Sequence, residues 1–137
     1  GNPLPISGAI FISVNESDKI KSITLARDFK ELGFNIIATS GTAKLLSENG
    51  INVNSIFKVG EGRPNIVDAI KNGEVQLVIN TPLGAQSRYD EYEIGKCAIR
   101  YKITTITTLS GAQAAVRGIR NIKSSSIQYH SLQDIFI

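Results

Sequence analysis

Three strand-like apolar runs of the chain each end directly in a cluster of polar residues. The runs cover residues 9–12, 34–38 and 75–79, and the polar clusters that follow them begin at Ser13, Thr39 and Asn80. In an open parallel sheet the carboxyl ends of the strands converge on one crevice, which is where α/β domains bind ligands. The clusters contain hydroxyl groups, a lysine and a glycine-containing turn, which suit an anionic ligand such as phosphate.

Strand-like and helix-like segments alternate along the whole chain. The expected strands cover residues 9–14, 34–39, 53–57, 75–80 and 103–108. The expected helices cover residues 18–32, 42–48, 65–71, 90–101 and 110–120, and a short element or two is expected in residues 126–137. Ser17 or Asp18 is the expected N-cap of the first helix, and Ser110 that of the last. The apolar face of the first helix is expected to contain Ile20, Ile23 and Leu32, with Ala26 or the stem of Arg27 and Phe29 or the stem of Lys30 between them. This alternation predicts a parallel sheet in a three-layer α/β sandwich.

The length of 137 residues fits one domain with its own core. Residues 1–7, with two prolines, are expected to be a linker or a cloning remnant, and residues 8–137 the single domain. No apolar run approaches the roughly 20 residues that a membrane-spanning helix needs, so we expect no membrane partner. The net charge of +3 comes from lysines and arginines spread along the chain, so we expect no nucleic-acid partner.

The chain has one cysteine, Cys97, and one histidine, His130. A single cysteine rules out an internal disulfide and fits a reducing compartment, so we expect a cytoplasmic protein. The two residues lie far apart in the sequence, which argues against a zinc site with the usual nitrogen and sulfur ligands. Cys97 is expected to be a small core residue, and no carboxylate pair stands out for acid–base catalysis. The sequence therefore predicts a binding protein without metal or catalytic residues.

The segment from Thr39 to Thr42 has two interpretations. It can be a plain strand-to-helix turn with a capping hydroxyl, or its hydroxyl and free N–H groups can hold a phosphate at a helix N-terminus. It lacks the lysine directly before Ser or Thr that a P-loop requires. Lys19 and Lys58 are the candidate phosphate cations because each closely follows an expected strand, although a lone lysine is most often a solvated surface group.

Two further segments also leave alternatives open. Residues 60–64, with two glycines and a charged pair, are expected to form either a ligand-facing turn or a plain surface turn. Asn80 ends a strand that is expected to be central and buried, where a side-chain amide has to be satisfied. It either bonds a neighbouring loop or contacts a polar edge of a ligand.

These motifs together resemble the methylglyoxal-synthase-like superfamily, and more narrowly the C-terminal allosteric domain of the carbamoyl-phosphate synthase large subunit. The resemblance covers nearly the whole chain from Gly8, in order and without large gaps, and its most specific block runs from Glu61 to Glu74. The segments that carry it are residues 12–14 and 18–19, 38–43, 58–64, 70–74, 78–82 and 107–109.

The resemblance implies a five-stranded parallel sheet of order 3-2-1-4-5, with a switch point between strands 1 and 4. In the bacterial family the pocket at that point binds nucleoside monophosphates, the inhibitor UMP and the activator IMP. Carried over to this chain, Ser13 would lie beside the phosphate and Asn80 would face ribose or base. The phosphate-binding residues would be Lys19, Thr39, Thr42 and Lys58.

The resemblance also implies a much larger parent enzyme. That parent is an ATP-dependent ligase using Mg or Mn, which makes carbamoyl phosphate for arginine and pyrimidine biosynthesis. The implied partners are the catalytic domains of the same chain, a glutaminase small subunit and further copies in an oligomer. This segment would be regulatory, with neither catalytic residues nor a cofactor of its own.

Two positions depart from the best-known member of the family. Pro82 replaces a threonine two residues after the strand-4 asparagine, which affects base or ribose recognition but not phosphate binding. Thr105 replaces a tyrosine that takes part in ornithine activation, so the resemblance does not extend to ornithine.

The alternatives to an effector-binding domain are a methylglyoxal-synthase-type lyase and a structural oligomerisation domain. The lyase carries a Gly-Asp-Gln-Gln motif where this chain has residues 61–64, and a catalytic histidine that residues 81–90 lack. Proton abstraction next to a carbonyl needs such a placed base. The purine-pathway cyclohydrolase domain shares the turn at residues 39–42 but carries a Lys-Thr-Leu-His-Pro segment that is absent here. Ligand titration separates the structural alternative from an effector domain.

Overall fold

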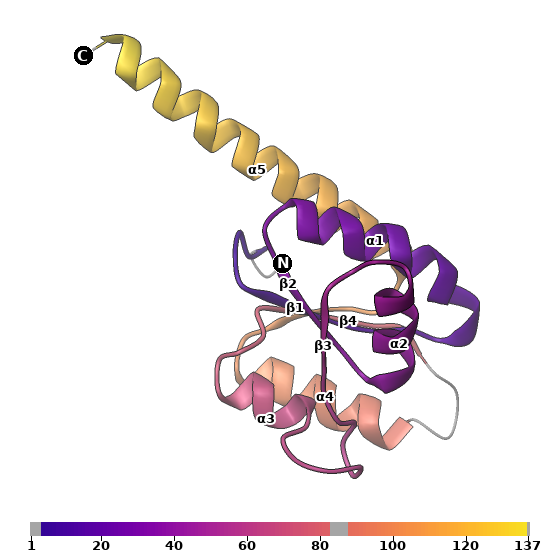
Figure 1. The fold of residues 1–137 in the computed structure, drawn as a ribbon. Coiled ribbons are helices and arrows are strands. Elements are labelled where there is room, and N and C mark those ends of the chain that lie inside the picture. Colours follow the sequence, from indigo (N-terminus) through magenta and orange to yellow (C-terminus); the bar gives the residue numbers. More distant parts are fainter. Residues whose placement is uncertain (1–3, 83–87, 137) are drawn as a thin grey trace.

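The computed structural model describes residues 4–82 and 88–136, with side chains up to residue 82 and from 89 to 125 (Figure 1). Strands and helices alternate as predicted. The strands are β1 (Ala9–Ser13), β2 (Asn35–Ala38), β3 (Val53–Ser55), β4 (Leu77–Asn80) and β5 (Thr104–Ile106). The helices are the 3-10 turn η1 (Glu16–Asp18), α1 (Lys19–Glu31), α2 (Ser40–Glu48), α3 (Ile66–Lys71), α4 (Arg88–Arg100) and α5 (Leu109–Phe136).

The five strands form one sheet in the order β3-β2-β1-β4-β5, and every neighbouring pair is parallel. The predicted order and fold class are therefore confirmed. The pairing register brings Ser13 opposite Asn80, and Ile12 opposite Ala38. The carboxyl ends of the three central strands are thus level with one another. Because the chain runs from β1 outward to one edge and then returns to pair β4 on the other side of β1, the switch point lies between β1 and β4.

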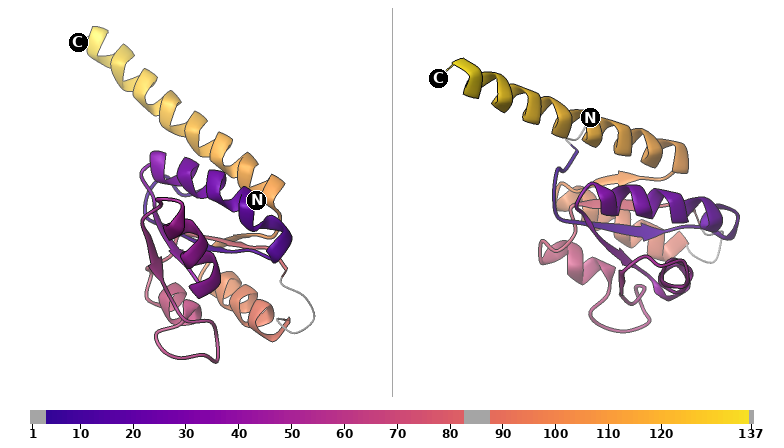
Figure 2. Two further views of the ribbon diagram at one scale, coloured as in Figure 1. Left: turned by 45° about the vertical axis from the view of Figure 1, so that its right-hand side comes forward. Right: turned by 45° about the horizontal axis from the view of Figure 1, so that its top comes forward.

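Alternate residues of the central strands serve two separate cores. Ile10 and Ile12 point to one face of the sheet, together with buried residues of α1, α2 and α5. Phe11 and Val78 point to the opposite face, which α3 and α4 cover. Figures 1 and 2 show the sheet between these two helical layers. Strands buried on both faces explain the continuous apolar runs in the sequence.

The last helix differs from its prediction at both ends. It extends to Phe136 instead of ending near Arg120. No glycine or proline follows Gly118, so nothing in the sequence breaks the helix. Both views of Figure 2 show its end extending beyond the body of the domain. Its first turn is capped by Thr108, whose hydroxyl oxygen accepts from the Gly111 N–H at 3.0 Å, and not by Ser110.

The first helix also differs in detail. Ile20, expected on its apolar face, is 78% exposed, whereas Leu25, Ala26 and Phe29 are buried. Asp18 is the N-cap residue, but its side chain makes no capping bond. The rest of the predicted face is confirmed, because Ile23 and Leu32 also pack against the core, so the prediction is wrong only in the first turn.

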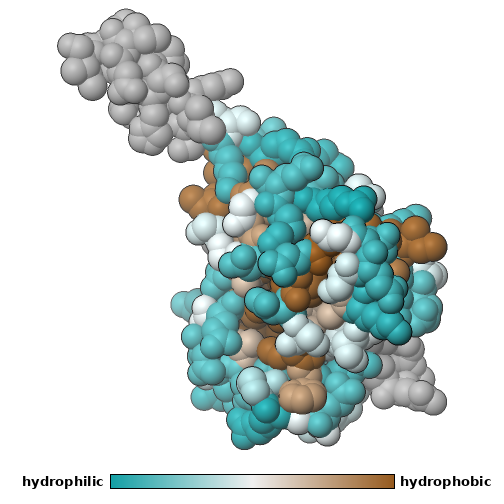
Figure 3. All heavy atoms as spheres, viewed as in Figure 1, coloured by the Kyte–Doolittle hydropathy of each residue, from teal (hydrophilic) through white to brown (hydrophobic). Residues whose placement is uncertain are grey.

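The surface of the domain is largely polar. On the face shown in Figure 3, hydrophilic residues cover most of the described surface, and hydrophobic residues form small separate patches. Leu4, within the predicted linker, packs against the core that lies under α1 and α5. Within residues 4–82 and 88–136, no helix is both long and apolar enough to cross a membrane.

A capping box at the start of α3 fixes the end of the loop that carries Lys58. The Asn65 side chain accepts from the Asp68 N–H at 3.2 Å, and the Asp68 carboxylate accepts from the Asn65 N–H at 2.9 Å. Arg63 donates to the same carboxylate at 2.6 and 3.2 Å. The hydrogen bond from Arg63 is the main reason that the pKa of Asp68 is lowered. The ionised Asp68 carboxylate therefore stabilises the folded chain at neutral pH, and this stabilisation is lost as the pH falls through the lowered pKa of Asp68.

We expect Asn65→Ala to lower the free energy of unfolding by about 1 kcal/mol, because the substitution removes a side-chain N-cap. Asn72→Ala, at the exposed other end of the same helix, is the matched control and should change stability by less than about 0.5 kcal/mol. Urea unfolding monitored by circular dichroism measures both changes. Equal effects of the two substitutions would contradict the capping role of Asn65.

Candidate functional site

All six predicted binding residues line two adjoining hollows at the carboxyl ends of the central strands. The hollows share Ser13, Thr39 and Lys58. One of the two hollows, which we call the outer cavity, has a volume of about 230 Å³. The outer cavity is lined by Ser13, Val14, Asn15, Glu16, Lys19, Thr39, Gly41, Thr42 and Lys58.

The N-terminus of α2 forms one wall of the outer cavity. Thr39 is its N-cap residue, and the Thr39 side chain makes no capping hydrogen bond. The first N–H groups of a helix have no partner within the helix, and they carry the positive end of its dipole. Thr42 and Gly41 lie in this first turn and line the cavity. The wall therefore combines hydroxyl groups with backbone N–H donors, which is the arrangement that binds phosphate at helix N-termini.

Lys19 supplies positive charge from the first residue of α1. A Cβ atom at Gly41 would lie 3.5 Å from Lys19 Nζ, so the ammonium group lies close to the start of α2. Lys19 Nζ also donates to Glu16 Oε1 at 2.5 Å. The side chain of Lys19 is 25% exposed, whereas that of Glu16 is 87% exposed. The lysine is thus drawn into the cavity wall while its carboxylate partner faces solvent.

Lys58 supplies the second positive charge from the loop between β3 and α3. Its N–H donates to Glu61 Oε1 at 2.9 Å, and the preceding Phe57 forms a parallel bridge with Asn65. These contacts hold both ends of the loop of residues 58–64. Lys58 lines both hollows, so its side chain lies at the junction between them.

The second hollow, which we call the slot, is narrow and mostly apolar. Its volume is about 20 Å³. Its walls are Phe11, Val59, Ile66 and Ile94, and its polar groups are Ser13, Thr39, Lys58, Asn80, Asp90 and Glu91. Burial raises the pKa of Asp90; the nearby charge of Lys58 acts in the opposite direction, and Glu61 and Glu91 raise the pKa further.

Four polar side chains of the site are buried without a hydrogen bond to the protein within the described residues. Ser13, Thr39, Thr42 and Asn80 are 4%, 4%, 3% and 7% exposed. No described side-chain nitrogen or oxygen is both fully buried and unpaired, so the polar atoms of these four residues reach the surface of the hollows. Because buried polar groups are normally hydrogen-bonded, the free bonding capacity of these four side chains is available to a ligand in the hollows.

Three charged residues of this site were missed by the sequence analysis: Glu16, Asp90 and Glu91. Each lies in the first turn of a helical segment that follows a strand. Lys19 was predicted because it lies shortly after the end of a strand, and the same argument could have identified Glu16. Asp90 and Glu91 depend on the rotation of α4 about its axis, which a periodicity argument does not fix.

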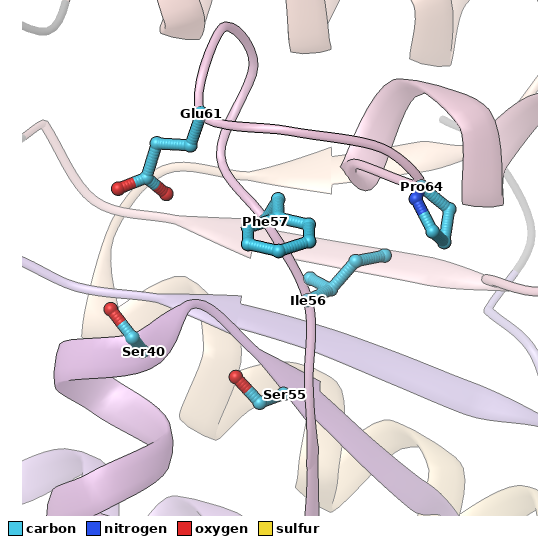
Figure 4. A pocket seen from close by; sticks show the side chains of 6 residues that line it. All are labelled: Ser40, Ser55, Ile56, Phe57, Glu61 and Pro64. Carbon is cyan, nitrogen blue, oxygen red and sulfur yellow. The ribbon is translucent and has the colours of Figure 1, made fainter.

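A larger hollow of about 400 Å³ lies at the edge of the sheet, beside β3, and we call it the edge groove. Figure 4 shows Glu61 and Pro64 on the loop above it, Phe57 and Ile56 at its centre, and Ser40 and Ser55 below. It contains none of the six predicted residues, and Phe57 within it is 49% exposed. The outer cavity is the better candidate site because buried polar groups and two cations converge there.

The described residues contain no cluster of three or more His, Cys, Asp or Glu side chains that could hold a metal ion. The side chain of His130 lies outside the described part of the structure. Cys97 is buried in the core under α3 and α4, as predicted, and burial raises the pKa of its thiol.

The MGS-like domain family matches residues 21–107 of the chain, which is more than half of it. This chain belongs to the MGS-like domain family. The match includes the N-terminus of α2, the Lys58 loop and β4, whereas the β1 end of the outer cavity precedes it.

Curated relatives of this MGS-like domain are large chains of carbamoyl phosphate synthase. The chain from Archaeoglobus fulgidus is 50% identical over 135 residues, which are 98% of this chain and 12% of the relative. The arginine-specific chloroplastic large chain from Oryza sativa is 44% identical over 137 residues, 99% of this chain and 12% of the relative. The C-terminal section from Aquifex aeolicus is 44% identical over 141 residues, covering 99% of this chain and 26% of that section. The chain therefore spans a small part of these relatives.

A solved structure with the same fold is methylglyoxal synthase from Elizabethkingia anophelis. The two structures align with a TM-score of 0.64 over 82% of this MGS-like domain and 79% of the synthase. Their sequences are only 16% identical, so the likeness establishes the fold and nothing about the reaction.

Proposed function

We propose that this chain is the effector-binding domain of a carbamoyl phosphate synthase large chain and that it binds a nucleoside monophosphate, with UMP and IMP as the candidates. The observation that carries the proposal is the set of buried polar side chains without protein partners, Ser13, Thr39, Thr42 and Asn80, at the switch point of the sheet. Lys19 and Lys58 beside them provide the charge that a phosphate group requires. The relatives named above connect such a domain to the synthase.

In this proposal the phosphate occupies the outer cavity. Its oxygens accept hydrogen bonds from the Thr39 and Thr42 hydroxyls and from N–H groups at the start of α2, and Lys19 and Lys58 balance its charge. Charge-assisted hydrogen bonds are stronger than neutral ones, so these lysines supply a large part of the affinity. Ser13 lies at the junction of the two hollows, next to the phosphate.

The nucleoside extends from the phosphate into the slot. Its apolar walls suit the faces of a planar ring, whereas Asn80, Asp90 and Glu91 can bond the polar edge of a ring or the ribose hydroxyls. The slot as it stands has room for about one water molecule, so its walls move apart when a ring enters. Pro82 and Thr105, the two departures from the family pattern, line neither hollow, and ornithine is not part of the proposal.

The parent protein in this proposal is a cytoplasmic ATP-dependent ligase, whose remaining domains bind ATP with Mg or Mn and work with a glutaminase subunit. The domain itself is regulatory and catalyses nothing. Nucleotide monophosphates are suitable regulators of such an enzyme because carbamoyl phosphate is a precursor of pyrimidines as well as of arginine.

Calorimetric titration of the chain with UMP, IMP, uridine, inosine and ornithine tests the proposal. We expect one of the two nucleotides to bind with a dissociation constant from about micromolar to millimolar, and both nucleosides to bind far more weakly. Incubation with dihydroxyacetone phosphate should yield no methylglyoxal. Absence of nucleotide binding by the folded chain would favour a structural oligomerisation domain, and enzyme-like formation of methylglyoxal would favour a lyase.

A further inference from the structure

The outer cavity has a negative charge at its rim. Glu16 lines this cavity, pairs with Lys19 at 2.5 Å and leaves 87% of its own side chain exposed. It does not line the slot. The Glu16 carboxylate is therefore the largely exposed, solvent-facing part of the lining of the outer cavity.

The turn that carries Glu16 is fixed at one point to the end of β4 and is closed by two hydrogen bonds of its own. The Asn15 N–H donates to the Thr81 hydroxyl oxygen at 2.9 Å, which joins the turn to the end of β4. The Asn15 side chain accepts from the Asp18 N–H at 3.0 Å and from the Ser17 hydroxyl at 2.8 Å. Because the backbone of the turn is held, Glu16 can rotate its side chain but stays at the rim of the cavity.

We propose that Glu16 is a specificity-determining residue, which makes the site select nucleoside monophosphates over the corresponding di- and triphosphates. The inference rests on the function proposed above. With a ring in the slot, the first phosphate lies between the shared residues and the α2 N-terminus. Any further phosphate then continues toward the rim, where the described lining offers it the Glu16 carboxylate.

The electrostatic argument compares the charges that each phosphate meets in the cavity. The first phosphate faces Lys19 and Lys58, which outweigh Glu16. A second phosphate adds about two negative charges near the rim, and like charges placed side by side oppose binding. Selectivity commonly depends on such a repulsive element against the wrong ligand as well as on attraction to the right one. Because Glu16 is largely exposed, solvent screens it, and its effect amounts to a several-fold rather than a thousand-fold difference.

Titration of Glu16→Gln with UMP, UDP, IMP and IDP tests this inference, at low salt, at pH 8 and in the presence of a chelator. We expect the substitution to raise diphosphate affinity about five- to tenfold and monophosphate affinity about twofold, so that the preference for monophosphate falls several-fold. Glu16→Lys should go further and favour the diphosphate. Raising the salt concentration should reduce the difference between wild type and Glu16→Gln.

Glu48→Gln is the matched control, since it removes the same charge from an exposed position at the far end of α2. It should leave the ratio of monophosphate affinity to diphosphate affinity unchanged.

An equal rise in the affinities for mono- and diphosphates in Glu16→Gln would mean that Glu16 only competes for Lys19, and it would overturn the inference. An unchanged ratio in both Glu16 variants would also overturn it. Absence of binding of either monophosphate to every variant would instead overturn the proposed function itself.

Discussion

Replacing Lys58 with alanine is expected to weaken nucleoside monophosphate binding by about one to two decades, because a charge-assisted hydrogen bond contributes roughly 1.5 to 3 kcal/mol. Lys58 lies in a loop at the junction of the two hollows, so its truncation leaves both cores intact. Calorimetric titration with UMP and IMP measures the loss. Affinity of the unmodified chain should also fall as added salt screens the cavity.

Two controls make this result specific to phosphate. Lys44→Ala removes an exposed lysine of α2 that lines neither hollow, and it should leave binding unchanged. Uridine and inosine, which lack the phosphate, should hardly distinguish Lys58→Ala from the unmodified chain. If the substitution weakens uridine and UMP equally, Lys58 does not act on phosphate, and the assignment of the outer cavity is wrong.

The same substitution has a second, ligand-free consequence. The charge of Lys58 lowers the pKa of Asp90, against the larger effect of burial. In Lys58→Ala the pKa of Asp90 should therefore rise further. A carboxyl carbon NMR titration of the ligand-free protein measures that change. An unchanged pKa would mean that the Lys58 side chain does not lie beside Asp90 in solution.

The second large effect is stabilisation of the fold by its ligand. At about 100 times its dissociation constant, a ligand that binds only the folded chain raises the free energy of unfolding by roughly 2.7 kcal/mol. For a domain of this size the corresponding rise in Tm is on the order of 5 to 10 °C. Differential scanning fluorimetry with UMP or IMP measures it, and uridine and inosine at the same concentrations should give little or no shift.

The Lys58→Ala protein provides the quantitative check. If the affinity of this variant is about thirtyfold lower, the same ligand concentration is only about three times the variant's dissociation constant. The ligand then raises its free energy of unfolding by only about 0.8 kcal/mol. The thermal shift should therefore shrink to about a third of its original size. An undiminished shift would show that the stabilising ligand binds elsewhere, with the edge groove beside β3 as the first place to examine.

The architecture followed from the sequence because parallel strands that are buried on both faces have a distinctive pattern. Continuous apolar runs, each followed by a helix, left few arrangements open. The six binding candidates came together for the same reason: they follow strand ends, and the Ser13–Asn80 register makes those ends level. Their binding roles stay predictions, which the titrations above test.

The details that the sequence did not predict depend on how a helix is placed against the sheet and on which of two nearby side chains makes a capping hydrogen bond. Periodicity does not tell where along α1 the helix begins to contact the core, so Ile20, in its first turn, was wrongly placed inside. Thr108 and Ser110 are both good caps, and only the backbone geometry decides between them. The site carboxylates were missed because α4 brings Asp90 and Glu91 to the slot only in one rotation about its axis.

The two hollows draw on different stretches of the chain. Every residue that lines the outer cavity lies between positions 13 and 58. The slot, apart from the shared residues, is built from Phe11 and from residues 59–94. In the proposed binding mode, phosphate binding and recognition of the attached nucleoside therefore depend on largely separate segments of the chain. If that binding mode holds, substitutions after position 58 can change which nucleoside is recognised without altering a residue of the outer cavity.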